Sequence, residues 1–85
     1  MGSKTFDGVW FLAYVHDHSP PHVHGKYAGT TVILDLDFMT REVRLSDRRN
    51  RIQPSNAKRS DVNRICQVAD EHAEELFALW EAARV

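Results

Sequence analysis

The hydrophobic pattern of this 85-residue chain changes period once, and that change limits the folds it can adopt. Over the last third, apolar side chains recur every three or four residues. They are Val62, Ile65, Cys66, Ala69, Ala73, Leu76, Phe77, Trp80 and Ala83. This spacing predicts one long amphipathic helix over about residues 57–83. Because such a helix cannot bury its apolar stripe alone, we expect it to lie across another element.

Segments before the helix have the composition or the alternation of β-strands. The predicted strands are residues 8–16, 22–27, 30–36 and 42–45. In the last two of them the inward-facing residues are expected to be Val32, Leu34, Leu36, Val43 and Leu45. Short connections indicate an antiparallel meander of three to four strands. We therefore expect a single α+β domain over residues 1–85, with the meander packed against one C-terminal helix.

Most of the large aromatic side chains are expected to anchor the core. Trp10 and Phe11 would do so from the first strand, and Phe77 and Trp80 from the helix. His72, on the same helix, is expected to pack at the edge of the sheet.

Composition favours a soluble globular protein in a reducing compartment. The hydrophobic share is 42% and the charged share 27%, both ordinary for a globular domain. A single cysteine, Cys66, excludes an internal disulfide and is expected to act as a small buried hydrophobe. No apolar run approaches the roughly 20 residues that span a membrane. We expect a cytoplasmic protein without a membrane partner.

Four histidines lie within nine residues of each other, around two adjacent prolines. They are His16, His18, His22 and His24. If residues 19–21 form a hairpin tip, His18 would lie opposite His22 and His16 opposite His24, so all four rings would share one face. Two prolines make an unusual hairpin tip, because proline lacks the N–H that a strand ladder uses. A wider loop would break this pairing but keep the cluster.

The cluster permits two kinds of chemistry. Four convergent imidazoles, His16, His18, His22 and His24, suit a transition metal such as Zn²⁺ or Ni²⁺. Without a metal, His18, His22 and His24 could serve as acid and base in phosphodiester cleavage, with Asp17 orienting one ring. The simpler interpretation is that the rings stack on the prolines and hold a turn in shape.

Charge is distributed unevenly, although the net charge is only −1. Residues 41–64 carry eight basic side chains against three acidic ones, between two acidic flanks. This segment predicts contacts with RNA, DNA or an anionic partner protein. The residues proposed for that contact are Arg44, Arg48, Arg49, Arg51, Lys26 and Tyr27. The alternative is a solvated surface whose charges pair within the chain, each pair contributing little.

The run Asp17-His18-Ser19-Pro20-Pro21-His22-Val23-His24 resembles the motif Asp-His-x-Pro-Pro-His-x-His of a family of small bacterial proteins, catalogued as domain of unknown function 4160. The likeness continues through the strand at residues 32–36 and returns at His72, Glu75, Leu76 and Trp80. It implies a compact α+β protein, often encoded beside another small protein in arrangements that look like toxin–antitoxin pairs.

The resemblance carries no catalytic mechanism, and residues 47–53 depart from the family pattern. Members tend to have a shorter loop there, rich in Gly and Leu. Taken together, the residues and the resemblance predict a component of a toxin–antitoxin-like module that binds a partner protein or RNA. The surface would combine the histidine hairpin with the arginines of residues 41–51. A His-dependent or metal-dependent hydrolase is the alternative.

Overall fold

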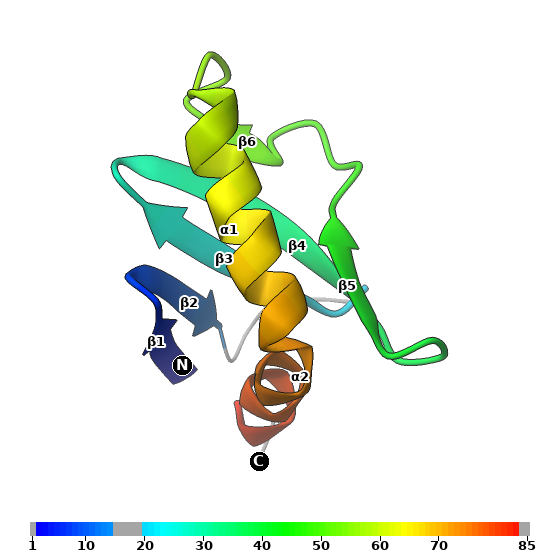
Figure 1. The fold of residues 1–85 in the computed structure, drawn as a ribbon. Coiled ribbons are helices and arrows are strands. Elements are labelled where there is room, and N and C mark those ends of the chain that lie inside the picture. Colours follow the sequence, from blue (N-terminus) through cyan, green and yellow to red (C-terminus); the bar gives the residue numbers. More distant parts are fainter. Residues whose placement is uncertain (1, 15–19, 84–85) are drawn as a thin grey trace.

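The structure, a computed structural model, describes residues 2–14 and 20–83 as one antiparallel sheet with two helices (Figure 1). The strands are β1 (Gly2–Phe6), β2 (Val9–Ala13), β3 (His22–Tyr27), β4 (Thr30–Asp37), β5 (Glu42–Leu45) and β6 (Ile52–Gln53). Their order across the sheet is β1-β2-β3-β4-β5, and β6 pairs with β4 beyond the end of β5. The helices are α1 (Arg59–Glu71) and α2 (Ala73–Ala82). The expected α+β meander is present, with strands β3 and β5 at the predicted ranges.

Two strands and a helix break correct the expected arrangement. Neither strand β1 nor strand β6 was predicted, because no strand was expected before residue 8 or between residues 45 and 57. The single long helix is also wrong, because His72 leaves helical geometry at φ −116° and ψ 31° and separates α1 from α2. The His72 ring stacks on Phe6 of β1 with centroids 4.1 Å apart. A histidine packed at the sheet edge is therefore where the helix axis turns.

Two tight turns set the register of the meander. Asp7 and Gly8 join β1 to β2 with φ of 49° and 83°, and Ala28 and Gly29 join β3 to β4 with φ of 51° and 80°. Positive φ at both central residues defines the type I′ turn, whose twist matches that of paired strands. Each turn connects directly opposed residues, Phe6 to Val9 and Tyr27 to Thr30.

One face of the sheet carries the core beneath α1 (Figure 1). A row across the strands runs Phe11, Gly25, Val32 and Ile52 by register. At its centre, a Cβ on Gly25 would lie 2.6 Å from Cγ2 of Ile65, so only glycine leaves room for the helix. The predicted inward residues Val32, Leu34 and Leu36 are buried here.

Some of the expected core residues lie elsewhere. Phe11, Phe77 and Trp80 are buried, whereas Trp10 keeps 41% of its surface exposed and points to the opposite face. Leu45, near the outer edge of the sheet, is 38% exposed. Strand β2 ends at Ala13, and residues 15 and 16 of the predicted first strand lie outside the described residues. None of the described helices combines the length and the apolar character needed to cross a membrane.

Candidate functional site

His22 and His24 share the sheet face opposite α1, because they stand two residues apart on strand β3. Their rings meet edge to face with centroids 5.3 Å apart. His24 also contacts the Tyr14 ring at 5.0 Å. His22 is only 3% exposed and packs 5.8 Å from the Trp80 ring, which reaches it from α2 at the end of the strand. The two imidazoles therefore form a packed aromatic cluster.

The predicted pairing across the histidine hairpin is wrong. Strand β3 pairs with β2 so that His24 lies opposite Leu12, where a tip at residues 19–21 would place His16. The carbonyl of Pro21 accepts a bond from the Leu36 amide at 2.9 Å, so the proline segment runs beside β4 and does not fold straight back over β2. The wider loop is the arrangement found. His16, Asp17 and His18 lie outside the described residues.

The metal and hydrolase hypotheses depend on those same residues. Among residues 2–14 and 20–83, no three His, Cys, Asp or Glu side chains gather as a metal site would require. A site built from His22, His24, His16 and His18 stays a prediction, and so does the catalytic role of His18, His22, His24 and Asp17.

The arginine loop, residues 46–51, is held against β4 where β5 stops and β6 begins. The Ser46 amide donates to the carbonyl of Ile33 at 3.0 Å, and the Ile33 amide donates to the carbonyl of Arg51 at 2.8 Å. The Ser46 side chain is buried, and its hydroxyl oxygen accepts from the Arg48 amide at 3.1 Å. Both ends of the loop are thus fixed to one residue of the central strand.

Arg48 joins this loop to the proline–histidine segment, residues 20–24. Its Nη2 lies 3.2 Å from the Pro20 carbonyl oxygen and 3.1 Å from Nδ1 of His22. That Nδ1 is also 3.0 Å from the Pro20 oxygen. With the proton on Nδ1 the imidazole donates to Pro20, and with the proton on Nε2 it accepts from Arg48. The two segments singled out in the sequence therefore meet at one guanidinium group.

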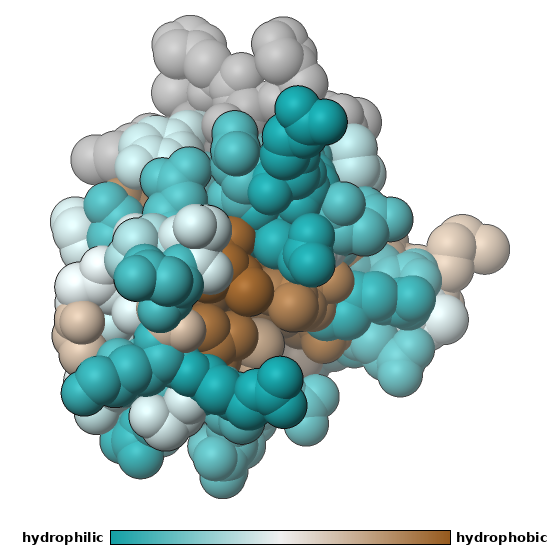
Figure 2. Space-filling view, turned by 90° about the horizontal axis from the view of Figure 1, so that it is seen from above, coloured by the Kyte–Doolittle hydropathy of each residue, from teal (hydrophilic) through white to brown (hydrophobic). Residues whose placement is uncertain are grey.

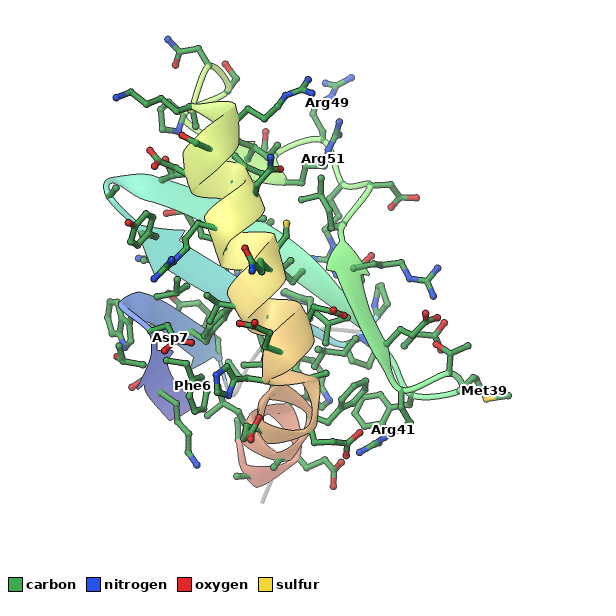
Figure 3. All side chains as sticks on the ribbon, in the orientation of Figure 1. Phe6, Asp7, Met39, Arg41, Arg49 and Arg51 are labelled. Atoms are coloured by element: carbon green, nitrogen blue, oxygen red, sulfur yellow. The ribbon has the colours of Figure 1, made fainter. Side chains whose placement is uncertain are left out.

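The structure brings together only some of the predicted binding residues. Arg49 and Arg51 are exposed on the loop, and Figure 3 shows them extending from it near one another. Arg44 instead pairs with Asp37 at 2.9 Å, so part of its charge is balanced within the chain. Tyr27 packs against the core on the α1 side of the sheet, beside Arg64. It therefore lies on the other face of the sheet from His22, the residue that Arg48 contacts.

Lys26 lies on the sheet face opposite α1 and covers Trp10, which sequence reasoning had placed in the core. Its Nζ is 5.5 Å from the centroid of the indole. The two residues are directly opposed in register. Strand alternation is the signal that could have predicted an exposed Trp10. Val9 and Phe11, on either side of it, take the buried face, and neighbouring residues of a strand point to opposite faces.

The described surface includes two hollows near the candidate site and beside α1. One, of about 360 Å³, is walled by Pro20, Pro21, Leu36 and Phe38. At its edge Asp35 has a buried carboxylate oxygen, Oδ1, without a hydrogen-bond partner among the described residues. The other, of about 370 Å³, lies between α1 and the ends of β5 and β6, and is the brown depression ringed by teal in Figure 2. Its floor includes Leu45, Ile52, Ala57 and Val62.

Fold and site together define a small α+β protein with one helix-covered sheet face and a cationic loop joined to a proline–histidine segment. Residues 8–81 match the sequence model of the family described as domain of unknown function (DUF4160). Because the match spans most of the chain, the protein belongs to this family. Neither the curated proteins nor the solved structures contain a significant match.

Proposed function

We propose that this protein is the nucleic-acid-binding component of a toxin–antitoxin-like pair, and that its arginine loop binds the phosphates of RNA. Phosphate contacts by arginine supply most of the affinity in sequence-independent binding of nucleic acids. The toxin–antitoxin-like context comes from the resemblance of the proline–histidine motif to small paired-gene proteins. Recognition of RNA is the part of the proposal that the geometry supports.

The observation that carries the proposal is the position of Arg48. Because its guanidinium group contacts Pro20 and His22, the loop is held against the sheet and its other arginines are presented from a fixed base. Arg51 adds a bond from Nη1 to the carbonyl of Arg48 at 3.4 Å. A loop ordered in this way loses less conformational entropy on binding than a free one would.

The remaining charge on the loop is available to a ligand. Within the part of the chain that the structure describes, neither Arg49 nor Arg51 has a carboxylate partner, unlike Arg41 and Arg44. Arg49, and Arg51 through the N–H groups that do not bond to Arg48, can therefore take a phosphate in bidentate fashion, which arginine does better than lysine. These two residues are therefore the proposed phosphate contacts, and Arg48 is their positioning residue.

Replacing both phosphate contacts tests the proposal. The Arg49→Ala/Arg51→Ala variant should bind a labelled RNA oligonucleotide about tenfold or more weakly than the native chain at roughly 0.1 M salt. The slope of log affinity against log salt should become shallower by about 1.4, since each lost contact to a single strand removes roughly 0.7. Fluorescence anisotropy over a salt series measures both quantities.

A charge-matched control separates the loop from general attraction. Lys4→Ala/Lys58→Ala removes the same charge from two exposed lysines outside the loop. This control should keep the native salt slope. If the loop variant and the control bind RNA equally well, the loop is not the phosphate reader, and a partner protein becomes the ligand to seek there.

A further inference from the structure

The sheet face opposite α1 carries a polar strip that crosses four strands and begins at an exposed tryptophan. In register, Trp10 of β2 lies opposite Lys26 of β3, Lys26 opposite Thr31 of β4, and Thr31 opposite Gln53 of β6. Directly opposed residues of antiparallel strands share a face. The face is the one away from α1, because the alternate row through Gly25 lies under that helix.

Trp10 is the exposed aromatic side chain of this strip. An indole that keeps 41% of its surface in water presents part of an apolar ring to a ligand, with only the flexible Lys26 side chain over it. Bases stack on such rings with little regard for sequence, because every base has a π-face. The Lys26 ammonium lies over the ring, 5.5 Å from its centroid, so its flexible side chain would move aside for a base and stay close enough to pair with that nucleotide's phosphate.

The far end of the strip adjoins the arginine loop. Gln53 follows Arg51 by two residues, and the Arg51 carbonyl is bonded to Ile33 on the strand at the centre of the strip. Trp10 to Gln53 covers three strand spacings, about 14 Å. Trp10, Lys26, Thr31 and Gln53 include no carboxylate, and the loop carries three arginines against one exposed acid, Asp47, so positive charge prevails along the strip and the loop.

We infer that this strip is a stacking platform for single-stranded nucleic acid. A base stacks on Trp10, Lys26 neutralises its phosphate, and the strand continues over Thr31 and Gln53 towards Arg49 and Arg51. A site of this size takes about four nucleotides. The inference rests on the proposed function and adds to it the form of the ligand: a duplex, whose bases are already stacked, cannot use the indole.

The decisive measurement uses the full chain with an eight-nucleotide uridine RNA, its DNA counterpart and a duplex of matched length. Native protein should bind the single strands with quenching of the exposed indole, whereas the buried Trp80 responds little. Trp10→Ala should weaken single-strand binding about tenfold or more. Trp10→Phe keeps a smaller ring and should retain part of the affinity while abolishing the quench. Lys26→Ala should reduce the salt slope by about 0.7.

Met39→Ala is the matched control, because it removes an apolar side chain that is 93% exposed at the tip of the turn between β4 and β5, away from the strip (Figure 3). Thermal melting establishes that each variant is folded, and Trp10→Phe serves if Trp10→Ala is not. Native-like affinity in a folded Trp10→Ala variant, or equal affinity for duplex and single strand, would overturn the platform. If Arg49→Ala/Arg51→Ala still weakens RNA binding in that case, the proposed function stands without it.

Discussion

At the scale of single residues, the close approach of α1 to strand β3 depends on a position without a side chain, Gly25. Gly25 has an ordinary strand conformation, so glycine is required here for its small size and not for its backbone freedom. A Cβ at this position would be 2.6 Å from Ile65 and 3.1 Å from Phe11. Both neighbours are fully buried. An added methyl group has no solvent-facing direction in which to displace them, and α1 itself would have to move.

We therefore expect Gly25→Ala to lower the free energy of unfolding by about 1–3 kcal/mol, the usual cost of overpacking a core. Chemical denaturation monitored by circular dichroism measures the change. Gly29→Asn is the matched control: Gly29 has φ +80° but no atom near its Cβ position, and asparagine tolerates that conformation. A Gly25→Ala protein as stable as the control would show that α1 is not seated on this glycine.

The same scale shows what the sequence could and could not predict about the site. His22 and His24 share a face because of strand alternation alone, which depends only on their spacing. The contact of Arg48 with His22 joins residues 26 positions apart and depends on where β5 stops, which no local pattern encodes. Trp10 was misplaced because Val9 to Ala13 is apolar throughout, so the alternation between faces was hidden by composition.

At the scale of elements, strand β1 shows how one turn can add an edge to a sheet. The family match begins at residue 8, whereas β1 precedes it and pairs with β2 over its whole length. The Asp7-Gly8 pair between the strands is the strongest short hairpin signal a sequence offers, and it would have predicted β1. The break between the helices had no such signal, because His72 interrupts an apolar pattern that continues unchanged on both sides.

Deleting residues 2–6 tests whether β1 belongs to the stable unit. Phe6 packs against the core and stacks on His72, so its removal uncovers apolar surface on β2 and at the helix break. We expect a loss of about 2 kcal/mol in the free energy of unfolding, close to the burial of one large side chain. Ser3→Ala/Lys4→Ala, which keeps the strand, should stay within about 0.5 kcal/mol of the native value. Unchanged stability after the deletion would show that β1 does not contribute to the stability of the fold.

At the scale of the whole molecule, one ion pair and several ring contacts connect the turn between β4 and β5 to α2 at one end of the sheet. Arg41 Nη2 lies 2.8 Å from Oε1 of Glu74, and its guanidinium group is 4.1 Å from the Phe77 ring centroid. In the turn, the Asp37 carboxylate accepts from the amides of Met39 and Thr40 at 2.9 and 3.2 Å. Glu74 thus joins this end of the sheet to α2, and Asp37 holds the turn in its conformation.

Acidification should weaken these contacts between the turn and α2 and within the turn. Hydrogen bonds from the Thr40 and Met39 amides, and then the charge of Arg44, hold the pKa of Asp37 below its ordinary value. The hydrogen bond from Arg41 and its charge do the same for the pKa of Glu74. A carboxyl group whose pKa is lower in the folded state stabilises the fold above the unfolded-state pKa, and that contribution is lost as pH falls through the folded value.

Native protein should therefore lose stability from about pH 4 downwards. Asp37→Asn/Glu74→Gln should be less stable than native at pH 7. Its stability should fall less steeply on acidification (a flatter acid limb of stability against pH), so that the stabilities of the two proteins converge near pH 2. Denaturation midpoints measured across pH 2–7 test this. Asp70→Asn removes one exposed carboxylate that has no hydrogen bond within the described part of the chain, and should leave the native acid limb intact. Parallel acid limbs for native and double variant would mean that other carboxylates govern acid unfolding.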